Sequence, residues 1–215
     1  MQHRSPQFHN LRALDRQFFA RDPREVAREL LGKLLIRRHE RKLLAGRLVE
    51  VEAYLGADDA AAHAAAGRTA RNDVLFGPPG HAYVYLIYGN YFCLNVSCEP
   101  EGKAGCVLIR AAEPVDGLEH MARSRGLELG SPKALRLIAS GPGRLAQAFS
   151  ITRARDNGKD LLDAISDLRL ADDGYTPQRI LTTPRIGITK TADYPLRYIV
   201  AGSDYLSGPK KMNGR

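Results

Sequence analysis

The sequence predicts an α+β fold in a single domain with a largely antiparallel β-sheet, and three observations support this prediction. A chain of 215 residues with 44% hydrophobic and 26% charged residues has the size and composition of one globular domain. Strand-like segments concentrate in the middle and late chain instead of alternating regularly with helices, which disfavours a doubly wound fold. Gly89-Asn90 joins two of these segments as a tight hairpin turn. We expect one domain over residues 1–215, with flexible ends outside an ordered core at about 11–206.

Helix signals occur in four segments. The first helix is expected over 23–31, because Asp22 is a good N-cap, Pro23 occupies the first helical position and Gly32 can end the helix. Further helices are expected at 117–125, 132–139 and 144–149.

The segment Arg47–Leu55 alternates apolar and polar residues, which predicts a strand with two different faces. The face expected to point to the core carries Val49, Val51, Ala53 and Leu55. The other face carries Leu48, Glu50, Glu52 and Tyr54. Further strands are expected at Tyr83–Tyr88, Tyr91–Ser97, Cys106–Ala111, Arg185–Ile188 and Leu196–Val200.

Charge and cysteine content limit the class of protein. Lys and Arg number 32 against 24 Asp and Glu, and the resulting net charge of +8 favours a polyanionic partner such as nucleic acid. The three cysteines lack CxxC spacing and form no zinc-like cluster with histidine, so neither a disulfide framework nor a structural metal is expected. With no apolar signal-peptide core near the N-terminus and no long apolar run, we expect a soluble, cytoplasmic protein without a membrane segment.

Charged residues in two predicted strands are candidates for chemistry. Glu50, Glu52 and Tyr54 share one strand face, and a Glu shielded there could take a proton from water as a general base. The alternative is a pair of solvent-facing acids, because Glu is mostly exposed in proteins. Arg110 ends an apolar run, where it either caps the strand in solvent or grips a phosphate or carboxylate.

His63 lies in an Ala-rich segment that is expected to form a short helical turn, with Asp58 and Asp59 as its caps. Its small neighbours leave the imidazole accessible, so the ring could stack on a nucleobase or donate a hydrogen bond. The alternative is an ordinary surface or hydrogen-bonded histidine.

The run from 83 to 91 holds four of the nine tyrosines and places Tyr88 and Tyr91 beside the tight turn. Such a tip could enter a DNA duplex as a wedge between stacked bases. The alternative is ordinary cross-strand aromatic pairing. With a two-residue turn, Tyr85 and Asn95 fall on opposite faces of the hairpin, whereas one extra loop residue or a bulge would place Tyr85 opposite Asn95 on one face.

Several segments, taken in order, resemble the alkyladenine (3-methyladenine) DNA glycosylase family in its bacterial form. They are Glu52–Gly56, Ala62-His63, Arg68–Asn72, Tyr83–Gly89, Cys93–Asn95, Val107–Pro114, Gly141–Leu145 and Pro195–Tyr198. Their order and spacing agree with the family from roughly Phe18 to Ser207.

The resemblance implies a monofunctional base-excision repair enzyme that flips a damaged purine out of duplex DNA and hydrolyses its N-glycosidic bond, leaving an abasic site. The implied lesions are 3-methyladenine, 7-methylguanine, hypoxanthine and ethenoadenine. Glu52 matches the general base that activates water, and Arg110 matches a residue that helps to hold the nucleotide or the water. Tyr88 matches the intercalating residue.

The remaining matches form the base pocket that the resemblance implies. Tyr54, His63 and Tyr85 match the residues that stack the flipped base, and Asn95 matches a residue that disfavours the exocyclic amino group of guanine. Because Tyr85 and Asn95 must then share one pocket, we predict the odd hairpin register or a bulge.

The implied fold is a curved antiparallel sheet flanked by helices with a protruding β-hairpin, similar to the C-terminal domain of methionyl-tRNA formyltransferase. The implied partner is double-stranded DNA, the protein is expected to be a monomer, nucleoid-associated if bacterial, and no metal or organic cofactor is implied. No Lys matches a site residue, so a Schiff-base lyase is not supported. Two alternatives are a non-catalytic nucleic-acid-binding module of the same fold and a hydrolase of free nucleosides, which would not need the Tyr88 tip.

Overall fold

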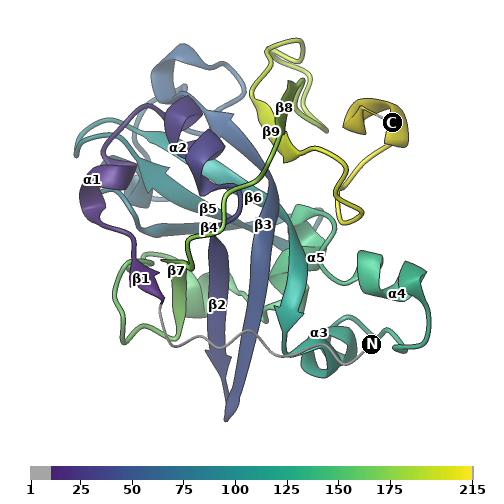
Figure 1. Ribbon diagram of the computed structural model, residues 1–215. Helices are drawn as coiled ribbons and strands as arrows, with labels where there is room; N and C mark the ends of the chain where they lie inside the picture. The colour runs from purple at the N-terminus through teal and green to yellow at the C-terminus, as the bar shows by residue number, and fades with distance from the viewer. Residues whose placement is uncertain (1–10, 215) are drawn as a thin grey trace.

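A computed structural model of the protein describes residues 11–214 (Figure 1). The expected flexibility of the first ten residues therefore lies outside the described residues, as does Arg215 of the basic C-terminal tail. Within 11–214 no helix is long and apolar enough to cross a membrane.

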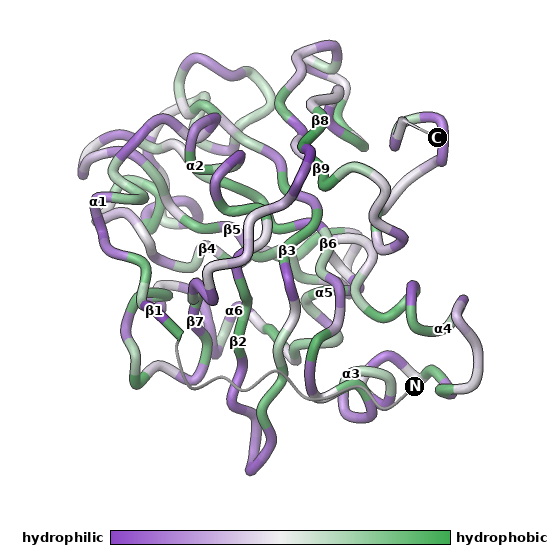
Figure 2. The backbone as a smooth tube through the Cα atoms, in the orientation of Figure 1, coloured by the Kyte–Doolittle hydropathy of each residue, from purple (hydrophilic) through white to green (hydrophobic). Residues whose placement is uncertain are grey.

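The described strands form one nine-stranded antiparallel sheet, which confirms the predicted fold class. The strands are β1 (Arg12–Ala13), β2 (Leu34–His39), β3 (Lys42–Tyr54), β4 (Ala82–Ile87), β5 (Tyr91–Cys98), β6 (Gly105–Asp116), β7 (Leu168–Asp172), β8 (Ile180–Thr183) and β9 (Arg197–Val200). Their order is β1-β7-β2-β3-β6-β5-β4, and β9 pairs with both β3 and β8 beside this path. The central strands are hydrophobic along much of their length, whereas the β2–β3 turn is hydrophilic (Figure 2).

Short helices flank the sheet. They are α1 (Arg16–Phe19), α2 (Pro23–Leu30), α3 (Leu118–Ser124), α4 (Pro132–Leu137), α5 (Pro142–Ala148) and α6 (Arg153–Asp156), with 3-10 turns at Gly56–Asp58, Asp73–Phe76 and Lys210–Asn213. All four predicted helices are confirmed, although α5 begins two residues before the predicted start. Asp22 caps α2 by accepting a hydrogen bond from Arg24 N at 2.7 Å. The helix α2 packs on β3 and β6, and α5 packs on β5 and β6.

Strand β3 is confirmed, but the predicted division of its faces is wrong in its first half. Its pairing with β6 shifts on both sides of Glu50, so Val49 on β3 and Arg110 on β6 have no partner in the register. Such an irregularity changes which face the following side chains occupy and is frequent next to active sites. Leu48, expected on the face of the two glutamates, is instead part of the main hydrophobic core with Val51.

The β4–β5 hairpin has the odd register that the shared pocket requires. Ile87 pairs with Tyr91, which leaves a three-residue loop at the tip. Tyr85 and Asn95 therefore point to the same face, as predicted, but Tyr85 lies opposite Cys93 rather than opposite Asn95.

One further expectation needs correction. The strand predicted at Arg185–Ile188 is an irregular loop, because this segment crosses the end of β3 and its Ile186 N–H bonds to the buried carboxylate of Glu52 instead of pairing with a strand. The segment around His63 forms short turns, as expected, with Ala65 N bonded to Ala62 O and Gly67 N bonded to Ala64 O.

Candidate active site

Strand β3 carries two glutamates into the interior at the position where it has neighbours on both edges. Over Glu50–Glu52 it pairs with β6 on one side and with β9 on the other. Both side chains are fully buried. The alternative of two solvent-facing acids is therefore wrong, and the shielded position expected for a general base is confirmed.

Three groups from different parts of the chain contact the Glu52 carboxylate. Ile186 N donates to Oε1 at 2.8 Å, Tyr54 Oη donates to Oε2 at 3.1 Å, and Arg110 Nη1 lies 3.2 Å from Oε2. Burial raises the pKa of Glu52 above its ordinary value, although Arg110 and the Ile186 N–H act in the opposite direction. Glu52 thus accepts a proton more readily than an exposed glutamate does.

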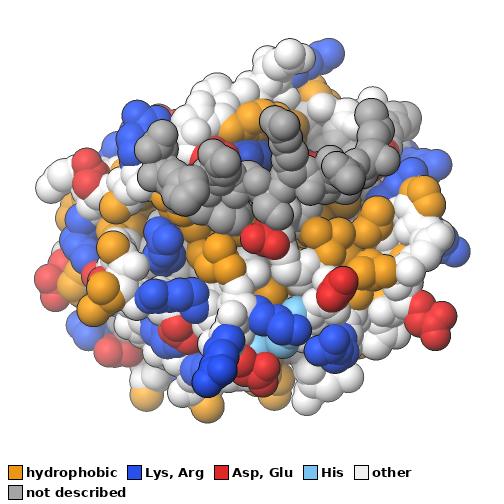
Figure 3. Space-filling view, turned by 60° about the horizontal axis from the view of Figure 1, so that its bottom comes forward, with side chains coloured by type: hydrophobic (Ala, Val, Ile, Leu, Met, Phe, Trp, Pro, Cys, Tyr) orange, Lys and Arg blue, Asp and Glu red, His pale blue; other side chains and the backbone are white. Residues whose placement is uncertain are grey.

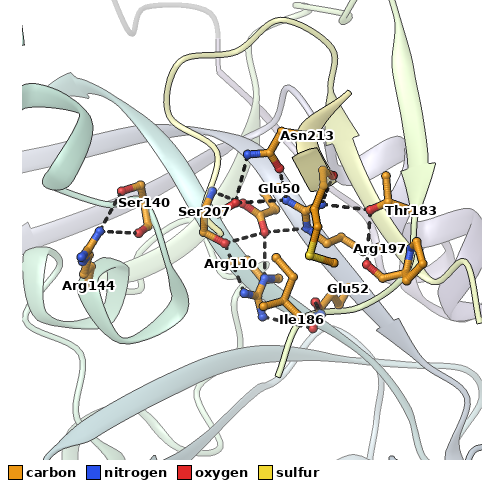
Figure 4. A network of polar contacts seen from close by, with 12 residues as sticks. Glu50, Glu52, Arg110, Ser140, Arg144, Thr183, Ile186, Arg197, Ser207 and Asn213 are labelled. Carbon is orange, nitrogen blue, oxygen red and sulfur yellow. Dashed lines mark hydrogen bonds and ion pairs between the residues drawn. The ribbon is translucent and has the colours of Figure 1, made fainter. Parts of the chain in front are cut away.

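Glu50 sits at the centre of the contacts drawn in Figure 4. Its Oε1 accepts from Arg110 Nε at 2.8 Å, from Arg197 Nε at 2.8 Å and from Ser207 Oγ at 2.7 Å. Burial alone would raise the pKa of Glu50, but Arg110 and Arg197 hold it below its ordinary value. We call Glu50, Glu52, Arg110, Arg197 and Ser207 the buried ion cluster. Because Arg110 grips carboxylates here, its alternative role as a solvent-facing strand cap is wrong.

A cavity of about 250 Å³, which we call the aromatic pocket, has Tyr54, a hydrogen-bond partner of Glu52, in its wall. It is lined by Tyr54, Ala61, His63, Leu75, Tyr83, Tyr85, Ile87, Tyr88, Asn95, Cys106, Gly187 and Ile188. Glu52 reaches the pocket wall through its hydrogen bond with the hydroxyl of Tyr54. All five residues predicted to bind or replace a base therefore line one cavity: Tyr54, His63, Tyr85, Tyr88 and Asn95.

The rings of the aromatic pocket are held by one another. The His63 and Tyr85 rings meet edge to face with centroids 4.5 Å apart, and His63 Nδ1 lies 2.9 Å from Tyr83 Oη. Burial, followed by the charge of Arg71, lowers the pKa of His63, which favours a neutral imidazole. Neutral aromatic faces on a pocket wall suit stacking against a flat, positively charged ring.

Tyr88 stands at the mouth of the aromatic pocket on the hairpin tip. Its side chain is 85% exposed, and its backbone has a φ of +49°, an uncommon conformation for a bulky residue. Large exposed aromatic side chains and strained backbone both concentrate at functional positions.

A second hollow of about 510 Å³ adjoins the first and shares Ile87 and Tyr88 with it. Arg110, Arg125 and Arg144 line it, so we call it the basic cleft. Lys and Arg side chains, with Asp and Glu among them, also lie on the face that Figure 3 shows, so net charge alone does not locate the site. Residues 11–214 contain no group of three or more His, Cys, Asp or Glu that could hold a metal ion.

Some functional contacts were missed by the sequence analysis. Asp59, expected only as a cap, does accept from Ala61 N at 3.1 Å but also pairs with fully buried Arg185, whose Nη2 lies 2.9 Å from Oδ1. Arg185 packs on the Tyr54 ring at 4.5 Å and precedes Ile186, which donates to Glu52. No local pattern could reveal this pair, because its members lie 126 residues apart.

Comparisons with known proteins identify a family that matches most of the chain. The sequence profile of the family described as methylpurine-DNA glycosylase matches residues 17–204. A protein of Koribacter versatilis is 66% identical over 202 residues, covering 94% of this chain and 96% of its own. Proteins of Burkholderia lata (47% identical, 91% of each chain) and Methanocella arvoryzae (49% identical, 86% of this chain and 88% of its own) are also similar. All three carry the name "Putative 3-methyladenine DNA glycosylase".

Proposed function

Because the chain belongs to the methylpurine-DNA glycosylase family, we propose that it removes alkylated or deaminated purines from double-stranded DNA by base flipping. As a DNA glycosylase it hydrolyses N-glycosidic bonds. The observation that carries the mechanistic proposal is a fully buried carboxylate, Glu52, hydrogen-bonded to Tyr54 in the wall of an aromatic pocket with an exposed tyrosine at its mouth.

In the proposed reaction Tyr88 enters the duplex and occupies the space that the flipped nucleotide leaves. The base enters the aromatic pocket and stacks on Tyr54, His63 and Tyr85. A cationic alkylated purine gains about 0.5–2 kcal/mol against an aromatic face relative to a neutral base, which favours lesions such as 3-methyladenine and 7-methylguanine.

Glu52 then takes a proton from the water whose oxygen bonds to C1′ of the sugar, while the C1′–N bond breaks and the base leaves with its electron pair, which makes a cationic methylated purine neutral. Its raised pKa improves it as a base, and its negative charge would stabilise the positive charge that develops on the sugar. Arg110, at hydrogen-bond distance from Glu52 and on the wall of the basic cleft, would hold the water or the nucleotide.

Asn95 supplies the proposed discrimination against guanine. Its Nδ2 donates to Tyr83 O at 3.1 Å, and its Oδ1 accepts a weak contact from the Cys106 thiol at 3.9 Å. Both ends of the amide are thus engaged, so an exocyclic amino group at this position lowers affinity, a loss that the cation–π gain offsets for 7-methylguanine but not for undamaged guanine.

The test is base release from duplex DNA that carries one hypoxanthine or ethenoadenine, and from methylated DNA, by the unmodified protein and by Glu52→Gln. We expect abasic sites from the unmodified protein and a rate at least about 10³-fold lower from the variant, since general bases contribute about 10²–10⁴-fold. Glu101→Gln, the same change at an exposed position, is the control and should retain full activity.

Three results would contradict the proposal in different ways. Binding without release by both proteins would select the non-catalytic nucleic-acid-binding module. Release from free nucleosides but not from duplex would select the nucleoside hydrolase. Full activity of Glu52→Gln, with folding verified by circular dichroism, would exclude Glu52 as the base.

A further inference from the structure

The buried ion cluster holds more charge than a single general base requires. Two glutamates, Glu50 and Glu52, and two arginines, Arg110 and Arg197, are all buried in it. Both arginines bond to the same oxygen of Glu50, Oε1, while only Arg110 reaches Glu52. Burying four charges together is costly unless each is paired and hydrogen-bonded, so the arrangement calls for a functional explanation.

The C-terminal segment 207–213 completes this cluster. Ser207 N donates to Glu50 Oε2 at 2.6 Å, and Ser207 Oγ accepts from Arg110 Nη2 at 3.2 Å. Arg197 donates to Met212 O at 3.0 Å and to Asn213 Oδ1 at 2.7 Å. The segment lies beyond residues 17–204, over which the family profile matches.

The Arg110 guanidinium is thereby fixed by three residues from two parts of the chain, β3 and the C-terminal segment. Its Nε bonds to Glu50 at 2.8 Å, its Nη2 to Ser207 at 3.2 Å, and its Nη1 lies 3.2 Å from Glu52. The planar fork of an arginine keeps these three directions rigid relative to one another. Fixing Nε and Nη2 therefore fixes where Nη1 meets the Glu52 carboxylate.

We propose that Glu50, held in place by Ser207 of the C-terminal segment, is a positioning residue for the glycosylase reaction: it aims Arg110 at Glu52 and shares the charge of Arg110, so that Glu52 remains a competent base. The proposal rests on the proposed role of Glu52. Without Glu50, the whole charge of Arg110 would act on Glu52 and would weaken it as a proton acceptor.

Several charged or titratable groups face Glu52 from the elements packed around it. They are Arg110 on β6, Cys93 on β5, Arg185 in the loop before Ile186, Arg197 on β9, and Tyr54 and Glu50 on β3 itself. Of these, Glu50 raises and Arg110 lowers the pKa of Glu52 after burial has raised it. Removal of the Glu50 charge should therefore lower the pH at which Glu52 loses its proton.

The first experiment measures base release from methylated duplex DNA by Glu50→Gln under single-turnover conditions with saturating enzyme, as a function of pH. Methylated purines keep their positive charge on the acid side, so the fall in rate at low pH reports a group on the enzyme. We expect this fall to move to lower pH, together with a lower plateau rate.

Asp156→Asn is the matched control for this experiment. Asp156 is as buried as Glu50 and pairs with a fully buried arginine, Arg37, at 2.7 Å, but it lies outside the cluster. We expect it to lower stability without moving the acid fall of the rate. The proposal would be overturned if the rate of Glu50→Gln fell at the same low pH, and reached the same plateau, as that of the unmodified protein.

A second variant covers the case in which Glu50→Gln does not fold. Ser207→Ala removes one bond from Glu50 and one from Arg110 but keeps the Ser207 N–H contact. We expect the saturated single-turnover rate to fall about 10-fold, since a misplaced catalytic group costs up to about 10²-fold. Ser97→Ala, at another fully buried serine, should leave the rate unchanged, and an equal rate for Ser207→Ala would overturn the proposal.

Glu52→Gln, measured in parallel, separates the two proposals. Suppose that Glu52→Gln loses base release while Glu50→Gln and Ser207→Ala keep the rate and the pH dependence of the unmodified protein. This result would refute only the positioning role of Glu50. Retained release in Glu52→Gln would refute the proposed base, whatever the other variants show.

Discussion

The tip of the β4–β5 hairpin is exposed and local, whereas the buried ion cluster is enclosed and assembled from segments far apart in the sequence. Tyr88 is 85% exposed and belongs to a loop of three residues. Glu50 is fully buried and bonds to residues 60, 147 and 157 positions away. The tip is placed to enter another molecule, whereas the cluster depends on contacts that bulk water would weaken.

The proposed recognition region and the proposed catalytic region therefore contribute differently to the stability of the fold. An exposed tip contributes little to folding, so it is free to insert into another molecule. Charges in a buried cluster interact more strongly than in water, but each must be compensated, so the cluster ties catalysis to the stability of the fold. Substitutions in the cluster should therefore lower the stability of the fold, whereas substitutions at the tip should lower activity without lowering stability.

The largest expected effect on stability is that of Arg197→Met. This change leaves Glu50 with one arginine instead of two and removes bonds to Thr183, Met212 and Asn213. Breaking a buried ion pair costs about 3–5 kcal/mol, and we expect a loss of this size in the free energy of unfolding, measured with urea at pH 7.

The control for this measurement is Arg47→Met. Arg47 pairs with Asp173 at 2.7 Å, but both side chains are partly exposed, and such pairs contribute about 0–1 kcal/mol. Similar losses in the free energy of unfolding of the two variants would show that the buried ion pair stabilises the fold no more than the partly exposed pair does.

The next effect in size concerns the tip, where Tyr88→Ser should change activity and leave stability alone. We expect the free energy of unfolding to stay within about 0.5 kcal/mol and base release from duplex DNA to fall about 10-fold or more, because the wedge that offsets unstacking is lost. Tyr194→Ser, at another exposed tyrosine, should affect neither quantity. A clear loss of stability in Tyr88→Ser would mean that this ring is part of the core.

The same contrast explains what could be predicted from the sequence. The α2 cap at Asp22 and the turn at Gly89 are local signals, and both elements formed where expected. The odd hairpin register was inferred only because Tyr85 and Asn95 had to share a pocket. Local patterns left each residue of the aromatic pocket with an ordinary alternative, and only the family resemblance joined them, since the lining residues come from the hairpin, the end of β3, β6 and three loops.

Long-range partners set the limit of that prediction. Strand β2 was not predicted from the sequence. Its Arg37 is polar but fully buried, where it pairs with Asp156 on α6, so the segment shows no regular alternation of apolar and polar residues. The loop at Arg185 was wrongly predicted as a strand because its apolar residues line a pocket instead of packing as part of a hydrogen-bonded β-sheet. Glu50 shared the face of Glu52 in the sequence, but nothing near it indicated Arg197 or Ser207.

The smallest expected effect is a difference in the pH dependence of stability between the two glutamates. Despite burial, two arginines depress the pKa of Glu50, so Glu50 stabilises the fold above its ordinary pKa of 4.5, and this stabilisation disappears as the pH falls through its folded pKa. Burial raises the pKa of Glu52, so its ionisation destabilises the fold at higher pH, and this penalty disappears as the pH falls toward 4.5. Relative to the unmodified protein, Glu52→Gln should gain free energy of unfolding as the pH rises from 4.5 through the folded pKa of Glu52, whereas Glu50→Gln should lose its disadvantage only below pH 4.5. Urea unfolding between pH 3.5 and about 8 measures both differences, and parallel curves for the two variants would show that the cluster treats its two carboxylates alike.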